Sequence, residues 1–103
     1  MIYLICYDIT DNRLRKKVSD KLVRVGLNRI QYSVFIGFIK DYLKEDLVSW
    51  LEMKFAPAIE KEERRNILIF NMTERQLGSK IALGETSFTD EEISGNLNTL
   101  YIG

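Results

Sequence analysis

The order of apolar and polar residues predicts a strand followed by a helix at the start of the chain. Residues 2 to 9 form a run that is apolar except at Asp8 and rich in β-branched and aromatic side chains, which is typical of a strand covered on both faces. Residues 14 to 25 then place apolar side chains at helical spacing, behind the cap-type residues Thr10 and Asp11. Gly26 is expected to end this helix.

The next segment predicts strand and then helix again. Residues 28 to 39 alternate between apolar and polar side chains, which is the period of a strand with one apolar face. We expect one strand here, or two strands with a bend near Tyr32 or Ser33. A second helix follows, with Asp41 as its expected cap and Pro57 near its end.

The pattern predicts one further strand and then weakens. Residues 66 to 72 are apolar on both sides, like the first strand. Beyond Thr73, we expect residues 81 to 83 and 97 to 102 to form short strands. Residues 84 to 95 are turn-rich and acidic.

This order of elements predicts an α+β fold, a ferredoxin-like βαββαβ sandwich with a short extra C-terminal strand. Residues 1–103 are expected to form a single domain, with residues 73–103 as a C-terminal extension involved in dimer packing. Two helices cover only one face of a sheet, yet two of the strands are apolar on both sides. We therefore predict a homodimer joined through the sheet. The alternative is that residues 73–103 fold back over that face.

Composition excludes several kinds of site. The chain contains no histidine, which removes imidazole bases and His-ligated metals, and its one cysteine, Cys6, has no partner for an intrachain disulfide. No run of about 18 apolar residues occurs, and the first ten residues lack the features of a signal peptide. We expect a cytoplasmic protein with no membrane contact.

Charge is unevenly distributed although the net charge is zero. Residues 1 to 40 carry eight Lys or Arg and three Asp, a net of +5, so the remainder sums to −5. Helical spacing places Arg13, Lys17 and Arg24 on one ridge, with Arg15 toward the opposite flank. Arg29 lies on the polar face of the next strand. Such a ridge suits the phosphates of RNA or DNA, but an ordinary solvated helix face has the same pattern.

Asp8 is the candidate for chemistry, because it interrupts an apolar strand and shares a face with Leu4 and Cys6. A buried carboxylate is costly unless it is paired or binds a metal, and Mg²⁺ prefers oxygen ligands. The alternative is that the strand has ended and Asp8 bonds a loop. One carboxylate provides few ligands for a metal ion, but a two-fold axis near the strand would bring two copies of Asp8 together. Asp11 is expected to cap the helix.

Three stretches together resemble the CRISPR-associated protein two family. They are residues 7 to 11 (YDITD), the basic start of the first helix, and residues 28 to 35 (NRIQYSVF). The resemblance implies a ferredoxin-like homodimer that acts as a metal-dependent endonuclease on RNA or DNA in spacer acquisition for antiviral defence. It also implies a CRISPR adaptation integrase as partner.

The resemblance further implies that Asp8 is catalytic and binds Mg²⁺ or Mn²⁺. Other matched residues are implied to line or support the site and its nucleic-acid surface: Tyr7, Arg15, Lys17, Arg29 and Phe35. Two positions depart from the family pattern, since Ile36 stands where many members have an acid and Lys17 where several have Arg. Two other functions stay open, a non-catalytic dimeric scaffold that binds DNA in the spacer-integration complex and a regulatory domain that binds a small ligand.

Overall fold

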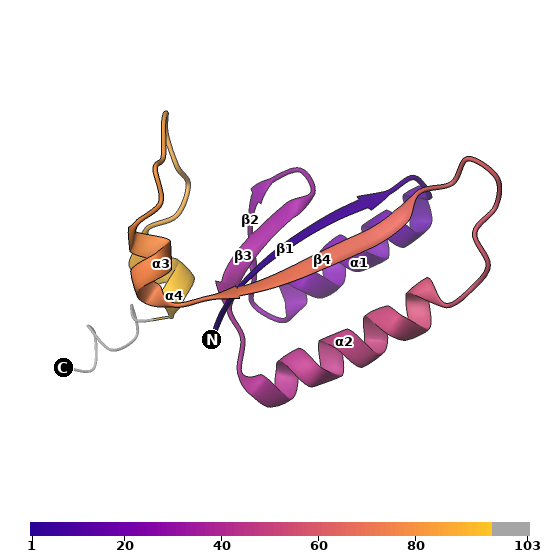
Figure 1. The fold of residues 1–103 in the computed structure, drawn as a ribbon, viewed down its shortest axis with the longest axis horizontal. Helices are drawn as coiled ribbons and strands as arrows, with labels where there is room; N and C mark the ends of the chain where they lie inside the picture. Colours follow the sequence, from indigo (N-terminus) through magenta and orange to yellow (C-terminus); the bar gives the residue numbers. More distant parts are fainter. Residues whose placement is uncertain (96–103) are drawn as a thin grey trace.

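A computed structural model describes residues 1–95 of the chain. Its strands form one four-stranded sheet in the order β2-β3-β1-β4, and every neighbouring pair is antiparallel. Two long helices lie side by side against one face of this sheet (Figure 1). The elements are β1 (Ile2–Ile9), α1 (Asn12–Arg24), β2 (Asn28–Gln31), β3 (Val34–Phe38), α2 (Asp41–Phe55), β4 (Arg65–Met72), α3 (Glu74–Gly78) and α4 (Asp90–Ser94). The expected mixed α/β domain is confirmed.

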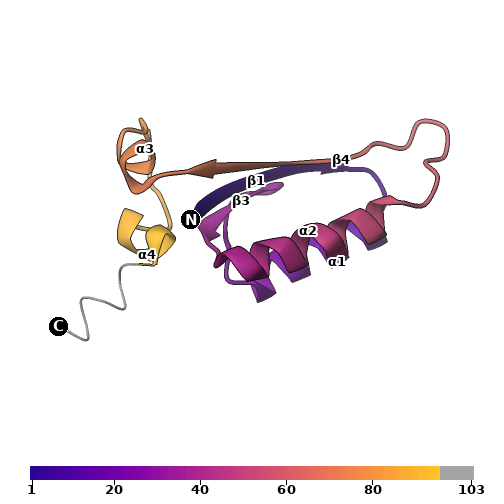
Figure 2. The same cartoon turned by 60° about the horizontal axis from the view of Figure 1, so that its bottom comes forward.

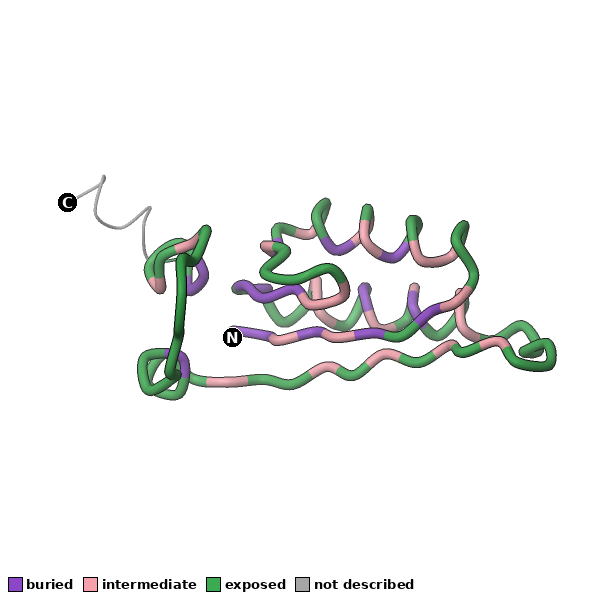
Figure 3. Tube along the Cα trace, turned by 90° about the horizontal axis from the view of Figure 1, so that it is seen from above, coloured by how far each residue is buried: buried purple, intermediate pink, exposed green. Residues whose placement is uncertain are grey.

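The core lies between the sheet and the two long helices, as Figure 2 shows edge-on. Strand β1 is paired on both edges, and its alternate side chains Tyr3, Ile5, Tyr7 and Ile9 are all buried in this layer. Helix α1 contributes Val18 and Leu22, and helix α2 contributes Leu47 and Leu51. Buried positions therefore follow period two along β1 and helical spacing along the helices (Figure 3).

The first helix begins and ends as its sequence predicts. The Asp11 carboxylate accepts a hydrogen bond from the backbone N–H of Leu14 at 2.8 Å, which confirms Asp11 as the cap. The helix ends at Arg24, and Gly26 follows with a φ of +101° that other residues rarely adopt.

The second helix begins differently from what its sequence predicts. Lys40 is its N-cap and makes no side-chain cap bond, so the expectation that Asp41 caps the helix is wrong. Asp41 instead lies in the first helical turn, where its negative charge favours the positive end of the helix dipole.

A tight connection separates β2 from β3 at Tyr32 and Ser33, which confirms the bend expected there. Gly37, on the helix side of β3, allows the close approach of Leu27, since a Cβ at this position would lie 3.0 Å from the Leu27 side chain. The hairpin thus packs closely on the segment that leaves α1.

The described part of the C-terminal extension contains two short helices. Each begins with a capping box, Thr73 with Gln76 in α3 and Thr89 with Glu92 in α4. The short strand expected at residues 81–83 is wrong, because these residues lie in a loop that projects beyond the two helices (Figure 1). The strand expected at residues 97–102 lies outside the described residues.

The face of the sheet opposite the long helices is only partly covered. Leu77 of α3 and Ile93 of α4 pack against Ile2 and Ile36 at one end of this open face. Farther along, Leu68 and Phe70 of β4 are each about half exposed, on the face for which the sequence pattern predicted a partner as cover. The alternative, that residues 73–103 fold back over this face, holds at one end only among the described residues, where α3 and α4 pack on Ile2 and Ile36.

The described residues include no helix that is both long enough and apolar enough to cross a membrane.

Candidate functional site

Asp8 lies on the open face near the end of β1. Its register partner on β4 is Asn66, so an amide side chain stands beside the carboxylate on the same face. The Asp8 side chain is 50% exposed, and its Oδ2 accepts a hydrogen bond from Nε of Arg64 at 2.9 Å. Asp8 is therefore bonded to a residue of the loop before β4, as the alternative interpretation expects, although β1 continues to Ile9.

On the other side of β1, Tyr7 points into the core and stacks on Phe35. The two ring centroids lie 6.2 Å apart with an interplanar angle of 23°. The Arg29 guanidinium lies 4.9 Å from the Phe35 centroid, and its Nη2 is 3.5 Å from the Tyr7 hydroxyl. The fold thus brings together three of the residues that the sequence singled out.

Arg15 and Tyr32 extend this group. Nη1 of Arg15 donates to the backbone carbonyl of Ile9 at 2.9 Å, which ties the guanidinium to the end of β1. The guanidinium groups of Arg15 and Arg29 lie 6.0 and 5.7 Å from the centroid of the same ring, Tyr32. That ring is 68% exposed. We call the whole group the basic–aromatic cluster: Tyr7, Arg15, Arg29, Tyr32 and Phe35.

Sequence reasoning missed Tyr32 as a site residue, although its place at the expected bend between two strands was an available signal. An aromatic ring attracts guanidinium groups through its negative face, and each such contact is worth about 0.5–1 kcal/mol when exposed. Tyr32 therefore holds two arginines near one another without neutralising their charge. Such a pair suits the oxygens of a phosphate group.

The cluster and Asp8 point to opposite faces of β1 within one chain. Tyr7 and Asp8 are consecutive residues, and side chains alternate along a strand, so one faces the helices and the other faces the open side. Arg15 and Arg29 are accordingly grouped around Tyr7 and the end of β1, while Arg64 accompanies Asp8.

The predicted ridge on α1 is exposed. Within residues 1–95, Arg13, Lys17 and Arg24 form no ion pair, so their charges are directed to solvent. The Nζ atom of Lys21, at the border of the ridge, instead lies 5.4 Å from the centroid of the Trp50 ring on α2. Three charges on one helix face remain for an anionic partner.

Arg13 and Lys17 also line a cleft of about 730 Å³ between α1 and the loop after α2. Acidic residues on the same lining, including Glu60 and Glu63, oppose their charges. The cleft is consequently a weak attractor for anions, and the solvent-facing side of the ridge is the better phosphate surface.

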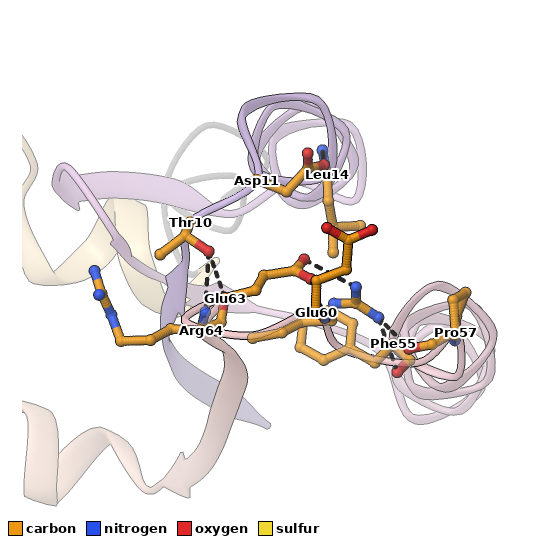
Figure 4. A network of polar contacts seen from close by, with 9 residues as sticks. Thr10, Asp11, Leu14, Phe55, Pro57, Glu60, Glu63 and Arg64 are labelled. Carbon is orange, nitrogen blue, oxygen red and sulfur yellow. Dashed lines mark hydrogen bonds and ion pairs between the residues drawn. The ribbon is translucent and has the colours of Figure 1, made fainter.

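A polar network fixes the loop that leads into β4 (Figure 4). The Arg65 side chain is 8% exposed and donates to Glu63 Oε1 at 2.9 Å and to the backbone carbonyl of Pro57 at 2.6 Å. The hydrogen bond from Arg65 and a second from the Glu60 backbone N–H hold the pKa of Glu63 below its ordinary value. Arg65 is thus structural, and its Nε is buried without a partner among the described residues.

The residues near Asp8 fit a weakly held divalent cation. No group of three or more His, Cys, Asp or Glu side chains gathers among residues 1–95, so the described part of one chain does not form a metal site with several protein ligands. A lone exposed carboxylate suits Mg²⁺ that keeps most of its waters, and a second copy would supply a second carboxylate. A carboxylate oxygen is therefore a suitable ligand for the cation, while the number of carboxylates favours a site shared by two chains.

These features define a small α+β protein with a carboxylate and a basic–aromatic cluster at one end of its central strand. The family model described as CRISPR associated protein Cas2 matches residues 1–80. A curated relative from Pyrobaculum aerophilum, named CRISPR-associated endoribonuclease Cas2 2, is 39% identical over 84 residues, which cover 82% of this chain and 87% of the relative. This chain belongs to the Cas2 family.

Two further proteins are similar to this chain. A Thermoproteus tenax protein named CRISPR-associated endonuclease Cas1/endonuclease Cas2 fusion is 31% identical over 83 residues, which cover 81% of this chain and 30% of the fusion. The crystal structure of Streptococcus pyogenes Cas2 aligns with a TM-score of 0.64 and 20% identity, and it covers 82% of this chain and 100% of that one. The latter likeness supports the fold.

The basic–aromatic cluster predicts that Tyr32 contributes to RNA binding through its ring. We expect Tyr32→Leu to weaken binding of a single-stranded RNA by up to about fivefold, because the ring would no longer hold the two guanidinium groups in place before RNA binds, at about 0.5 kcal/mol for each contact. Tyr32→Phe should bind as the wild type does. Fluorescence anisotropy measures both affinities, with Tyr42→Leu as control because Tyr42 is an equally exposed tyrosine on α2. Equal affinities for Tyr32→Leu and the wild type would remove Tyr32 from the binding surface.

Proposed function

We propose that this protein is a metal-dependent phosphodiester endonuclease that cleaves RNA, with DNA as a second substrate, in the spacer-acquisition module of antiviral defence. The observation that carries the proposal is the half-exposed Asp8 carboxylate at the end of the central strand in a chain of the Cas2 family. The name of the Pyrobaculum relative, an endoribonuclease, supports the same activity.

The proposed working unit is a ferredoxin-like homodimer. The strand order β2-β3-β1-β4 with α1 and α2 on one face supports the ferredoxin-like assignment. Exposed Phe38, Leu68 and Phe70 on the open face support a second copy as its cover, since apolar side chains gain most from losing contact with water. A two-fold axis across this face relates the two Asp8 residues.

In this dimer the Asp8 carboxylates would hold Mg²⁺ or Mn²⁺. When bound, such an ion lowers the pKa of a coordinated water and polarises the phosphate. Arg29, held by Phe35 and Tyr7 on the other face of β1, donates hydrogen bonds to phosphate oxygens elsewhere along the bound strand and positions the nucleic acid. The sequence has no histidine and hence no imidazole base, so we expect slow turnover.

A second candidate function is a dimeric scaffold that binds DNA without cutting it. The observation that favours it is the solvent-facing ridge of Arg13, Lys17 and Arg24, which carries charge on the helix layer rather than on the face of Asp8. We propose a Cas1-type integrase as the partner of either form, and the Thermoproteus fusion supports this pairing.

Substitution of the carboxylate tests the endonuclease. Asp8→Asn preserves shape and removes charge, so we expect cleavage of labelled RNA in Mg²⁺ to fall about 100-fold or more, equivalent to several kcal/mol of lost transition-state stabilisation. RNA binding should be unchanged. Asp20→Asn is the matched control, because Asp20 is an exposed carboxylate on α1 that pairs with Lys16. Cleavage that persists in Asp8→Asn, or in excess chelator, would favour the scaffold.

Salt dependence tests the ridge. Each phosphate contact contributes about 0.9 to the slope of log affinity against log salt for B-DNA, so Arg13→Gln with Lys17→Gln should flatten the slope by roughly two. The control is the charge-matched pair Lys40→Gln with Arg75→Gln, two exposed residues elsewhere on the chain. An unchanged slope in the Arg13 and Lys17 double variant would place the binding surface away from α1.

A further inference from the structure

Arg64 is held in place by its backbone. Its N–H donates to the Thr10 hydroxyl at 2.9 Å, and its carbonyl accepts from the Thr10 N–H at 2.9 Å and from the Thr10 hydroxyl at 3.3 Å. These contacts join residues that are 54 positions apart in the sequence. They fix the start of the Arg64 side chain near the end of β1, whichever side chain position 64 carries.

The Arg64 side chain, in contrast, is loosely engaged. It extends away from the Glu63 network (Figure 4) and is 64% exposed. Its contact with Asp8 runs through Nε alone, and its two terminal amino groups bond no other residue in the described part of the chain. The neighbouring Arg65 is the opposite case, because both of its terminal amino groups are bonded to the loop.

The strength of the contact follows from its exposure. Pairs between solvent-exposed ions contribute little, because water screens both charges and the long side chain must be held in one geometry. A divalent cation brings twice the charge to the same carboxylate and replaces a single hydrogen bond by direct or water-mediated coordination. The Arg64–Asp8 pair is therefore displaceable by Mg²⁺ or Mn²⁺ at small cost.

We propose that Arg64 is a displaceable counter-ion of Asp8 and a positioning residue for the phosphate. Without a divalent cation, the Arg64 guanidinium is paired with the Asp8 carboxylate. When the cation binds the Asp8 carboxylate, the Arg64 guanidinium is released. Because the backbone of residue 64 stays fixed beside Asp8, the guanidinium then binds a phosphate oxygen of the nucleic acid. This inference rests on the proposed function, since it requires that Asp8 bind the cation.

Two effects of opposite sign follow for Arg64→Gln. Loss of the competing guanidinium should tighten Mn²⁺ binding, by up to about fivefold, the equivalent of about 1 kcal/mol. Loss of the released guanidinium should weaken RNA binding severalfold in Mn²⁺ and leave it unchanged in chelator, where Arg64 stays on Asp8. A purely structural role would change RNA affinity equally under both conditions.

The experiment measures Mn²⁺ affinity by calorimetry and the affinity for a short single-stranded RNA by anisotropy, with and without Mn²⁺. The variants are Arg64→Gln, Arg64→Lys, Asp8→Asn and the charge-matched control Arg75→Gln. Because the anchor bonds to Thr10 use the backbone of residue 64, the Arg64 variants keep the fold. Arg64→Lys retains the positive charge and should restore part of the RNA affinity in Mn²⁺.

The outcomes distinguish the proposed metal site at Asp8 from the proposed role of Arg64. If Asp8→Asn binds Mn²⁺ as the wild type does, the proposed metal site fails and the role of Arg64 fails with it. If Asp8→Asn loses Mn²⁺ while Arg64→Gln binds Mn²⁺ with wild-type or lower affinity, the metal site stands and the Arg64 proposal is overturned. Equal loss of RNA affinity by Arg64→Gln with and without Mn²⁺ also overturns it.

Discussion

Strand β1 is hydrogen-bonded along both edges, to β3 and to β4, and this pairing determines where every other functional group lies. A strand paired on both sides cannot slip by one residue without moving its buried side chains into water. Tyr3, Ile5, Tyr7 and Ile9 therefore stay under the helices, and the intervening residues stay on the open face. Asp8 is on that face because its two neighbours are core residues.

This constraint divides the site into two parts. Tyr7 orders Phe35 and Arg29 on the helix side of the sheet, while Asp8 stands among Asn66 and Arg64 on the open side. On the open side, Asp8 stands beside apolar side chains that one chain leaves exposed to water. In the dimer that we propose, a second copy on the open face would supply both a second carboxylate and the cover for these side chains.

Elements whose signals are local were predictable from the sequence. The β1 run, the Asp11 cap of α1 and the bend at Tyr32–Ser33 depend on residues close together in the chain, and the structure has them. Helices α3 and α4 escaped prediction because five residues are too few to show helical periodicity. Asp41 was misassigned because a cap and a first-turn acid differ by one position.

The candidate site was only partly predictable for a related reason. The sequence identified Asp8, Arg15 and Arg29, and the fold places the two arginines around one aromatic ring, Tyr32. It gave no signal for Arg64, because its contact with Asp8 joins residues 56 positions apart. The exposure of Asp8 was also unpredictable, since an apolar run does not specify whether the second face is covered by the same chain or by another.

Sedimentation equilibrium at micromolar concentration tests most directly whether a second copy covers the open face. The informative variant is Phe70→Lys, which places a charge among the exposed apolar side chains of that face without disturbing the core. Its control is Tyr42→Lys, an exposed aromatic on α2. The account predicts a dimer for the wild type and Tyr42→Lys and a monomer for Phe70→Lys. A monomeric wild type, or a Phe70→Lys protein as dimeric as the wild type, would contradict it.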